Sequence, residues 1–171
     1  MIKGGKGGAN TKTGLHFESR ADMLELFKKR DGYKVSSDGS IFFKDKLVGQ
    51  HLRKNKLYKF LESKGVDHKK IISKKLLPDD ALYVPSAKTL FVIEMKFQKV
   101  AGSVDEKLQT CDFKKKQYIK LVKPLGLKAE YIYILNDWFR DHVYKDTLDY
   151  IKSVGCDYCF EELPLEKIKF I

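Results

Sequence analysis

The sequence predicts an α/β fold with a mixed central β-sheet that is flanked by helices. Near the middle of the chain, two apolar stretches at 76–85 and 90–98 alternate in the manner of strands, and helix and strand candidates alternate after them. The chain has 171 residues, of which 43% are hydrophobic, and this is enough for one domain with a substantial core. We therefore expect a single domain over residues 1–171.

Charge and composition narrow the range of partners. The chain carries 34 lysines and arginines against 23 aspartates and glutamates, a net charge of +11. This balance favours a polyanionic partner, with nucleic acid first, over a generally basic protein. The sequence has no apolar run long enough for a membrane span and no visible signal peptide, and its three cysteines suit a reducing compartment. We therefore expect a cytoplasmic protein.

The first 14 residues are rich in glycine and lysine, which predicts a flexible basic arm. Glycine lets backbone N–H groups approach phosphates closely, and short polar side chains can donate further hydrogen bonds. A disordered terminus without a function is the competing interpretation. The candidate phosphate contacts in this arm are Lys6, Asn10, Thr11 and Lys12.

Two helices are expected before the middle of the chain. Apolar spacing predicts the first over 15–29, and Glu18 lies beside its apolar stripe. The helix dipole alone would also favour a glutamate at that place. A weak hairpin at 33–43 follows, and the stretch 47–66 then predicts the second helix.

The second helix lies in a strongly basic segment, 44–75. We treat this segment as a candidate insertion that contacts nucleic acid through its phosphates. A solvated helix face explains such a run of lysines equally well. The candidate contacts are Arg53, Lys54 and Lys56.

The strand at 90–98 is apolar on one face and becomes polar at the C-terminal end of the other, where Glu94, Lys96 and Gln98 stand. Gln98 is a candidate DNA contact. A turn at 85–87 would fold the preceding strand back along it and bring one of the two aspartates 79 and 80 beside Glu94. Carboxylates gathered in this way form an oxygen-rich pocket for a hard divalent cation. The alternative is an ordinary amphipathic strand with a surface glutamate–lysine pair.

After these strands the pattern predicts a helix at 103–122, a strand at 129–136, a helix at 138–154 and a last strand at 156–164. In the first of these helices Gln109 could reach a site at the preceding strand end. Three lysines stand away from its apolar stripe and are candidates for holding phosphates: Lys114, Lys115 and Lys116.

The spacing of Cys156 and Cys159 is that of a zinc-binding pair. However, Cys111 is the only other cysteine, and no pair of histidines stands at ligand spacing. We therefore expect small buried thiols.

The dipeptide Pro78-Asp79, followed by Glu94 and Lys96 on the next apolar strand, resembles the signature of the PD-(D/E)XK nuclease superfamily, and most of all its type II restriction endonucleases. The blocks at 7–18 and 102–110 also resemble such enzymes. The resemblance implies a restriction-endonuclease-like core in which Asp79 and Glu94 hold Mg²⁺. It also implies that Lys96 orients the attacking water or stabilises the transition state, and that Glu18 supports the metal site.

The function implied by this resemblance is Mg²⁺-dependent, site-specific cleavage of double-stranded DNA. The small size of the chain and the usual symmetry of oligomers suggest a homodimer. A repair nuclease or junction resolvase on the same fold is the alternative within the enzymes. A non-catalytic DNA-binding protein with surface carboxylates is the alternative outside them.

Periodicity leaves open which aspartate is the metal ligand, because both faces of the strand at 76–85 hold apolar residues. The resemblance favours Asp79. Three carboxylates together would raise one another's pKa, so we expect Asp80 to point away, to a lysine or a helix N-terminus.

Overall fold

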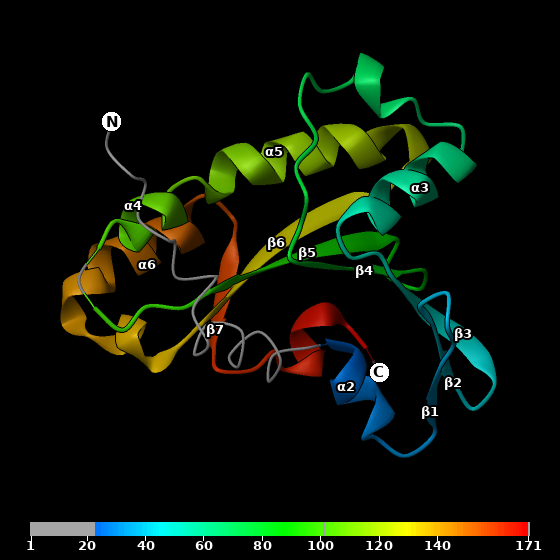
Figure 1. Ribbon diagram of the computed structural model, residues 1–171, viewed down its shortest axis with the longest axis horizontal. Helices are drawn as coiled ribbons and strands as arrows, with labels where there is room; N and C mark the ends of the chain where they lie inside the picture. The colour runs from blue at the N-terminus through cyan, green and yellow to red at the C-terminus, as the bar shows by residue number, and fades with distance from the viewer. Residues whose placement is uncertain (1–22, 101, 171) are drawn as a thin grey trace, which may run out of the picture.

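The structure is a computed structural model that describes residues 23–100 and 102–170. At its centre is a seven-stranded sheet in which the strands lie side by side in the order of the sequence, β1 to β7. Helices α3 and α5 cover one face, and α2 and the C-terminal segment cover the other (Figure 1). The predicted α/β class and the mixed, helix-flanked sheet are therefore confirmed.

The sheet has an antiparallel part and a parallel part. Each strand from β1 to β4 is antiparallel to the next, whereas β5, β6 and β7 run parallel to one another. The strands are β1 (Tyr33–Val35), β2 (Ser40–Phe43), β3 (Lys46–His51), β4 (Asp80–Val84), β5 (Thr89–Lys96), β6 (Lys128–Leu135) and β7 (Asp157–Phe160).

The α-helices in the described residues are α2 (Met23–Lys28), α3 (Asn55–Ser63), α4 (Val104–Leu108), α5 (Cys111–Val122) and α6 (Lys145–Ser153). Short 3₁₀ turns occur at His68–Lys70, Lys123–Leu125, Asp137–Arg140, His142–Tyr144 and Leu165–Ile168. Within 23–100 and 102–170, no helix has the length and apolar character needed to cross a membrane.

Strand β5 lies between β4 and β6, which confirms its predicted central place. Its alternate side chains enter two different cores. Leu90 and Val92 pack in the core beneath α3 and α5, whereas Phe91 and Ile93 pack with α2 and the C-terminal segment. Because both faces of β5 are buried along most of its length, only its C-terminal end can present polar groups.

The predicted hairpin is formed by β4 and β5. The register pairs Asp80 with Ile93 and Val84 with Thr89. The turn is closed by the backbone N–H of Lys88, which donates to the carbonyl oxygen of Pro85 at 3.1 Å. This local turn sets the register that brings the start of β4 beside the end of β5.

The predicted helix over 47–66 is wrong in its first half, where the chain forms β3 and α3 begins only at Asn55. β3 is hydrogen-bonded to β2 and β4, and this pairing outweighs the helical spacing of its side chains. Its Gly49 lies against the Phe170 ring, where a Cβ would come within 2.6 Å of a ring atom. The basic segment 44–75 thus supplies one strand of the sheet and a helix that covers it.

Three other predicted elements are shorter than expected. The helix over 103–122 is broken where the Thr110 hydroxyl donates to the Lys107 carbonyl at 2.7 Å, since such a local bond competes with the helix. Before α6, the Asp141 carboxylate accepts from the Val143 N–H at 3.1 Å and caps a separate 3₁₀ turn. The last strand stops at Phe160.

The other predicted elements agree with the structure. The hairpin expected at 33–43 is formed by β1 and β2, and the strand expected at 129–136 is β6. The described part of the helix expected at 15–29 is helical over Met23–Lys28.

Candidate functional site

A polar cluster lies where the beginning of β4 meets the end of β5. Asp79 directly precedes β4, and its Oδ2 accepts a hydrogen bond from the backbone N–H of Met95 at 3.0 Å. The Asp79 carboxylate thereby accepts a hydrogen bond that a backbone carbonyl would accept within the β4–β5 ladder. This bond holds the Asp79 carboxylate against the last residues of β5.

The two carboxylates converge on the ammonium group of Lys96. Its Nζ lies 3.1 Å from Glu94 Oε2 and 3.5 Å from Asp79 Oδ2. It also donates to the carbonyl oxygen of Met95 at 3.1 Å. Three oxygens from two strands thus surround one cation, and we call Asp79, Glu94 and Lys96 the carboxylate–lysine cluster.

Burial strengthens the electrostatic interactions in this cluster. The Glu94 side chain is only 7% exposed and that of Lys96 is 20% exposed. Burial alone lowers the pKa of Lys96, but the neighbouring Glu94 and Asp79 raise it by more, so its pKa lies above the ordinary value. The two carboxylates therefore favour the ammonium form of Lys96, which is a hydrogen-bond donor.

A second lysine reaches the same glutamate from helix α5. Lys114 Nζ lies 3.4 Å from Glu94 Oε2, and the Lys114 side chain is 26% exposed. One carboxylate oxygen of Glu94 is thus shared by two ammonium groups. Lys114 was predicted as a phosphate contact, and its contact with Glu94 was not predicted. A helical pattern does not indicate which strand residue a side chain will contact.

The other two lysines of the group expected to hold phosphates lie elsewhere. Lys115 Nζ contacts Glu130 Oε2 at 2.8 Å and donates to the carbonyl oxygen of Gly155. Lys116 is exposed and forms an ion pair with Asp112, one helical turn earlier, at 2.7 Å. The three lysines therefore point to three different places.

We expect Lys115→Gln to lower the free energy of unfolding by about 1–2 kcal/mol, because it removes two charge-assisted hydrogen bonds from a side chain that is only 15% exposed. Lys116→Gln is the matched control and should leave stability nearly unchanged, because exposed ion pairs contribute little. Urea unfolding of the two variants measures the difference. Equal stability of both would show that the Lys115 contacts do not hold α5 to the sheet.

Asp80 points away from the carboxylate–lysine cluster, as expected. It is 2% exposed, and its Oδ1 accepts from the N–H of Ala81 at 2.8 Å and contacts Nε2 of His51. The expected partner was a lysine or a helix N-terminus. The partner is instead a histidine of β3, in a stretch that was predicted to be part of a helix.

Gln98 is held by its backbone just after β5. Its N–H donates to Asn136 Oδ1 at 3.0 Å, and Asn136 Nδ2 donates to the Gln98 carbonyl at 2.9 Å. The Gln98 side chain is buried, which leaves little of it for a DNA contact. Asn136 was not predicted as a site residue, although a polar residue directly after an apolar strand was a signal for it.

The remaining predicted contacts are dispersed. Gln109 is exposed at the break between α4 and α5, and no described contact links it to the cluster. Arg53 and Lys54 lie closer, because the Lys54 N–H donates to the Pro78 carbonyl at 3.3 Å, and Lys56 is exposed on α3. Five predicted residues lie outside the described part of the chain: Lys6, Asn10, Thr11, Lys12 and Glu18.

The three cysteines are free and buried, which agrees with the expectation of small buried thiols. Burial raises the pKa of the Cys159 thiol to about 12, so it remains protonated at neutral pH. Within 23–100 and 102–170, no group of three or more histidine, cysteine, aspartate or glutamate side chains is arranged to hold a metal ion. Among the described side chains, a cation at Asp79 and Glu94 would therefore find no third carboxylate, histidine or cysteine ligand.

Comparisons of the chain with protein-family models, with curated proteins and with solved structures find no match. A function can therefore be inferred only from the residues of the carboxylate–lysine cluster and their geometry.

Proposed function

We propose that the protein is a Mg²⁺-dependent, site-specific endonuclease that hydrolyses phosphodiester bonds of double-stranded DNA, with a restriction-endonuclease-like core. The observation that carries this proposal is the convergence of Asp79 and Glu94 on Lys96 at the end of β5. The net charge of +11 supports a polyanionic substrate.

The burial of the cluster argues against an ordinary surface ion pair. A solvated glutamate–lysine pair needs no third partner, yet Glu94 is 7% exposed and shares one oxygen between Lys96 and Lys114. Burying a charged carboxylate such as Glu94 is costly unless it serves a purpose that an apolar residue could not serve. A protein that only binds DNA gains nothing from carboxylates beside its substrate.

The donor set fits a magnesium ion. Mg²⁺ takes oxygen ligands and is commonly held by one or two carboxylates, with water and substrate phosphate completing its shell. Asp79 Oδ2 and Glu94 Oε2 already face one cation, the Lys96 ammonium, and the Met95 carbonyl faces it too. When bound, Mg²⁺ would neutralise charge on the scissile phosphate and lower the pKa of a bound water.

The chain's own residues then have distinct tasks. Asp79 and Glu94 supply the negative oxygens that hold the ion. Lys96, which remains protonated, can donate to the attacking water or to the charge that develops on the phosphate. Lys114 contacts the same oxygen of Glu94 from helix α5 and can leave it to meet a phosphate.

A homodimer completes the proposal. One cluster in each chain cuts one strand, and two-fold symmetry places two clusters on the two strands of a duplex. Two successive nicks by a monomer are the alternative, and sedimentation of the DNA complex separates the two.

A plasmid digest with and without Mg²⁺ tests the function itself. Discrete bands that require Mg²⁺ support a site-specific endonuclease, and sequencing of the ends gives the cut position. Cleavage of branched or damaged DNA only would favour a junction resolvase or a repair nuclease. A mobility shift without any cleavage would make the protein a DNA binder and overturn the proposal.

Lys114→Gln should bind Ca²⁺ or Mg²⁺ about threefold or more tightly in the absence of DNA, because it removes a competing cation 3.4 Å from Glu94. The same change should weaken DNA binding, since one positive charge is lost from the substrate side. Calorimetric titration of the metal and a DNA-binding assay measure the two effects. Lys116→Gln, on the same helix but paired with Asp112, is the control. Unchanged metal affinity in Lys114→Gln would contradict this role.

A further inference from the structure

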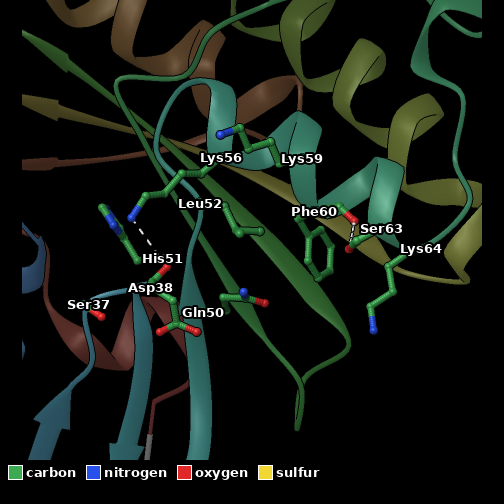
Figure 2. A pocket seen from close by; sticks show the side chains of 10 residues that line it. All are labelled: Ser37, Asp38, Gln50, His51, Leu52, Lys56, Lys59, Phe60, Ser63 and Lys64. Atoms are coloured by element: carbon green, nitrogen blue, oxygen red, sulfur yellow. Dashed lines mark hydrogen bonds between the residues drawn. The ribbon is translucent and has the colours of Figure 1, made fainter.

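A cavity of about 490 Å³ lies between α3, the end of β3 and the turn that joins β1 to β2 (Figure 2). Its lining includes Asp38 from the turn, His51 from β3, and Lys56, Lys59 and Lys64 from α3 and its C-terminal end. We call it the α3 cavity. It is separate from the carboxylate–lysine cluster, and the proposed chemistry does not use it.

The three lysines give the α3 cavity an excess of positive charge. Among the described residues, no carboxylate pairs with any of the three, unlike Lys115 and Lys116. Lys56 Nζ lies 3.5 Å from the carbonyl oxygen of Asp38 and reaches across the cavity to it (Figure 2). These ammonium groups are therefore available to an anionic ligand.

The single carboxylate in the lining is already engaged. The side chain of Asp38 accepts hydrogen bonds from the Ser36 hydroxyl and from the N–H and hydroxyl of Ser40. These bonds hold the pKa of Asp38 at about 2. Asp38 is therefore ionised but forms no ion pair with these lysines, and three lysines against one carboxylate leave an excess of positive charge in the lining.

His51 provides an independent sign of a ligand. It lines the cavity although it is only 4% exposed, and its Nε2 faces Asp80. Its Nδ1 is buried and has no hydrogen-bond partner within the described residues. A buried polar atom of this kind normally finds a partner in a ligand or an ordered water.

The α3 cavity is joined to the carboxylate–lysine cluster through the residues around β4's start. The N–H of Leu52 donates to the Ala81 carbonyl at 2.8 Å, and that of Lys54 donates to the Pro78 carbonyl at 3.3 Å. Between these two bonds, Asp80 faces His51 while Asp79 faces Lys96. These two hydrogen bonds hold the rim of the cavity to the start of β4, the segment that also supplies Asp79.

We infer that the α3 cavity binds backbone phosphates of the DNA strand that flanks the scissile bond. Lys56, Lys59 and Lys64 contact these phosphates, and His51 Nδ1 completes one of the contacts directly or through one water. The inference rests on the proposed function, because it takes DNA as the substrate. The α3 cavity positions the DNA strand and takes no part in the chemistry.

The test compares two triple variants with the same loss of charge. One replaces Lys56, Lys59 and Lys64 with glutamine. The control replaces Lys120, Lys123 and Lys128, which are exposed and line no part of the cavity. Binding to a short labelled duplex is followed by fluorescence anisotropy in Ca²⁺ over a range of salt concentrations, and thermal melting checks that both variants are folded.

The cavity variant should bind at least about tenfold more weakly and lose about two to three units of salt slope, close to the 0.9 expected for each phosphate contact. The control should lose much less of both. The double change Lys59→Gln with Lys64→Gln, which leaves the Lys56–Asp38 bond intact, should act in the same direction. Equal losses in both triple variants would show a general charge effect and overturn the inference.

The remaining outcomes separate this inference from the proposed function. Mg²⁺-dependent cleavage by the wild type together with unchanged DNA binding by the cavity variant would overturn the inference alone. Failure of the wild type to bind DNA would overturn both. Calorimetry with a free deoxynucleoside monophosphate adds a last arm. If the wild type binds it, and the cavity variant loses that binding but keeps its duplex affinity, the site belongs to a free nucleotide and the DNA assignment is wrong.

Discussion

If Glu94 is a metal ligand as proposed, Glu94→Gln should lower Mg²⁺-dependent DNA cleavage by at least about a hundredfold, since loss of a direct metal ligand costs at least as much as loss of its supporting contacts. The substitution keeps the shape of the side chain and removes its charge. Lys96 and Lys114 would then share the single negative charge of Asp79, and the local net charge would rise by one. DNA binding in Ca²⁺ should therefore survive and could even become tighter.

Glu130→Gln is the matched control for this experiment. Glu130 lies on the neighbouring strand β6, pairs with Lys115 and is 42% exposed, so its loss removes the same charge without touching the cluster. Initial rates of plasmid cleavage and anisotropy with labelled DNA measure the two effects. Near-normal cleavage by Glu94→Gln, with Glu130→Gln also active, would refute the active-site assignment.

Asp79→Asn should abolish cleavage, whereas Asp80→Asn should keep most of it and lose stability instead. Asp79 Oδ2 faces Lys96 and accepts a hydrogen bond from the Met95 N–H. An asparagine oxygen can accept the same hydrogen bond, but without a negative charge it binds a cation less strongly than a carboxylate does. Asp80 is buried against His51 on the other side of the strand, so its change should cost about 1–3 kcal/mol of unfolding free energy.

Cleavage assays at a temperature at which both variants are folded, together with chemical denaturation, separate the two outcomes. Asp79→Asn should unfold almost as the wild type does. The reverse pattern, with Asp80→Asn inactive and Asp79→Asn active, would move the proposed ligand to Asp80. The roles proposed for Glu94 and Lys96 would not change.

The central hairpin could be predicted from the sequence because its signals are local. The alternation of β5 follows from the two-residue period of a strand, and the turn closes within the four residues from Pro85 to Lys88. Once that turn is formed, the register brings Asp79 beside the end of β5. The same reasoning required that Asp80 face the opposite way, as it does.

Local sequence patterns thus predicted the α/β class, the central place of β5 and the meeting of Glu94 and Lys96 with one of two neighbouring aspartates, of which the family resemblance favoured Asp79. The sequence patterns did not predict that Lys46–His51 is a strand, that Lys114 contacts Glu94 or that Asp80 contacts His51. Each of these depends on a partner from a distant part of the chain. The helix propensities of most residues differ by only about a few tenths of a kcal/mol. Pairing across a sheet and packing between a helix and a sheet contribute more than this and therefore override local preference.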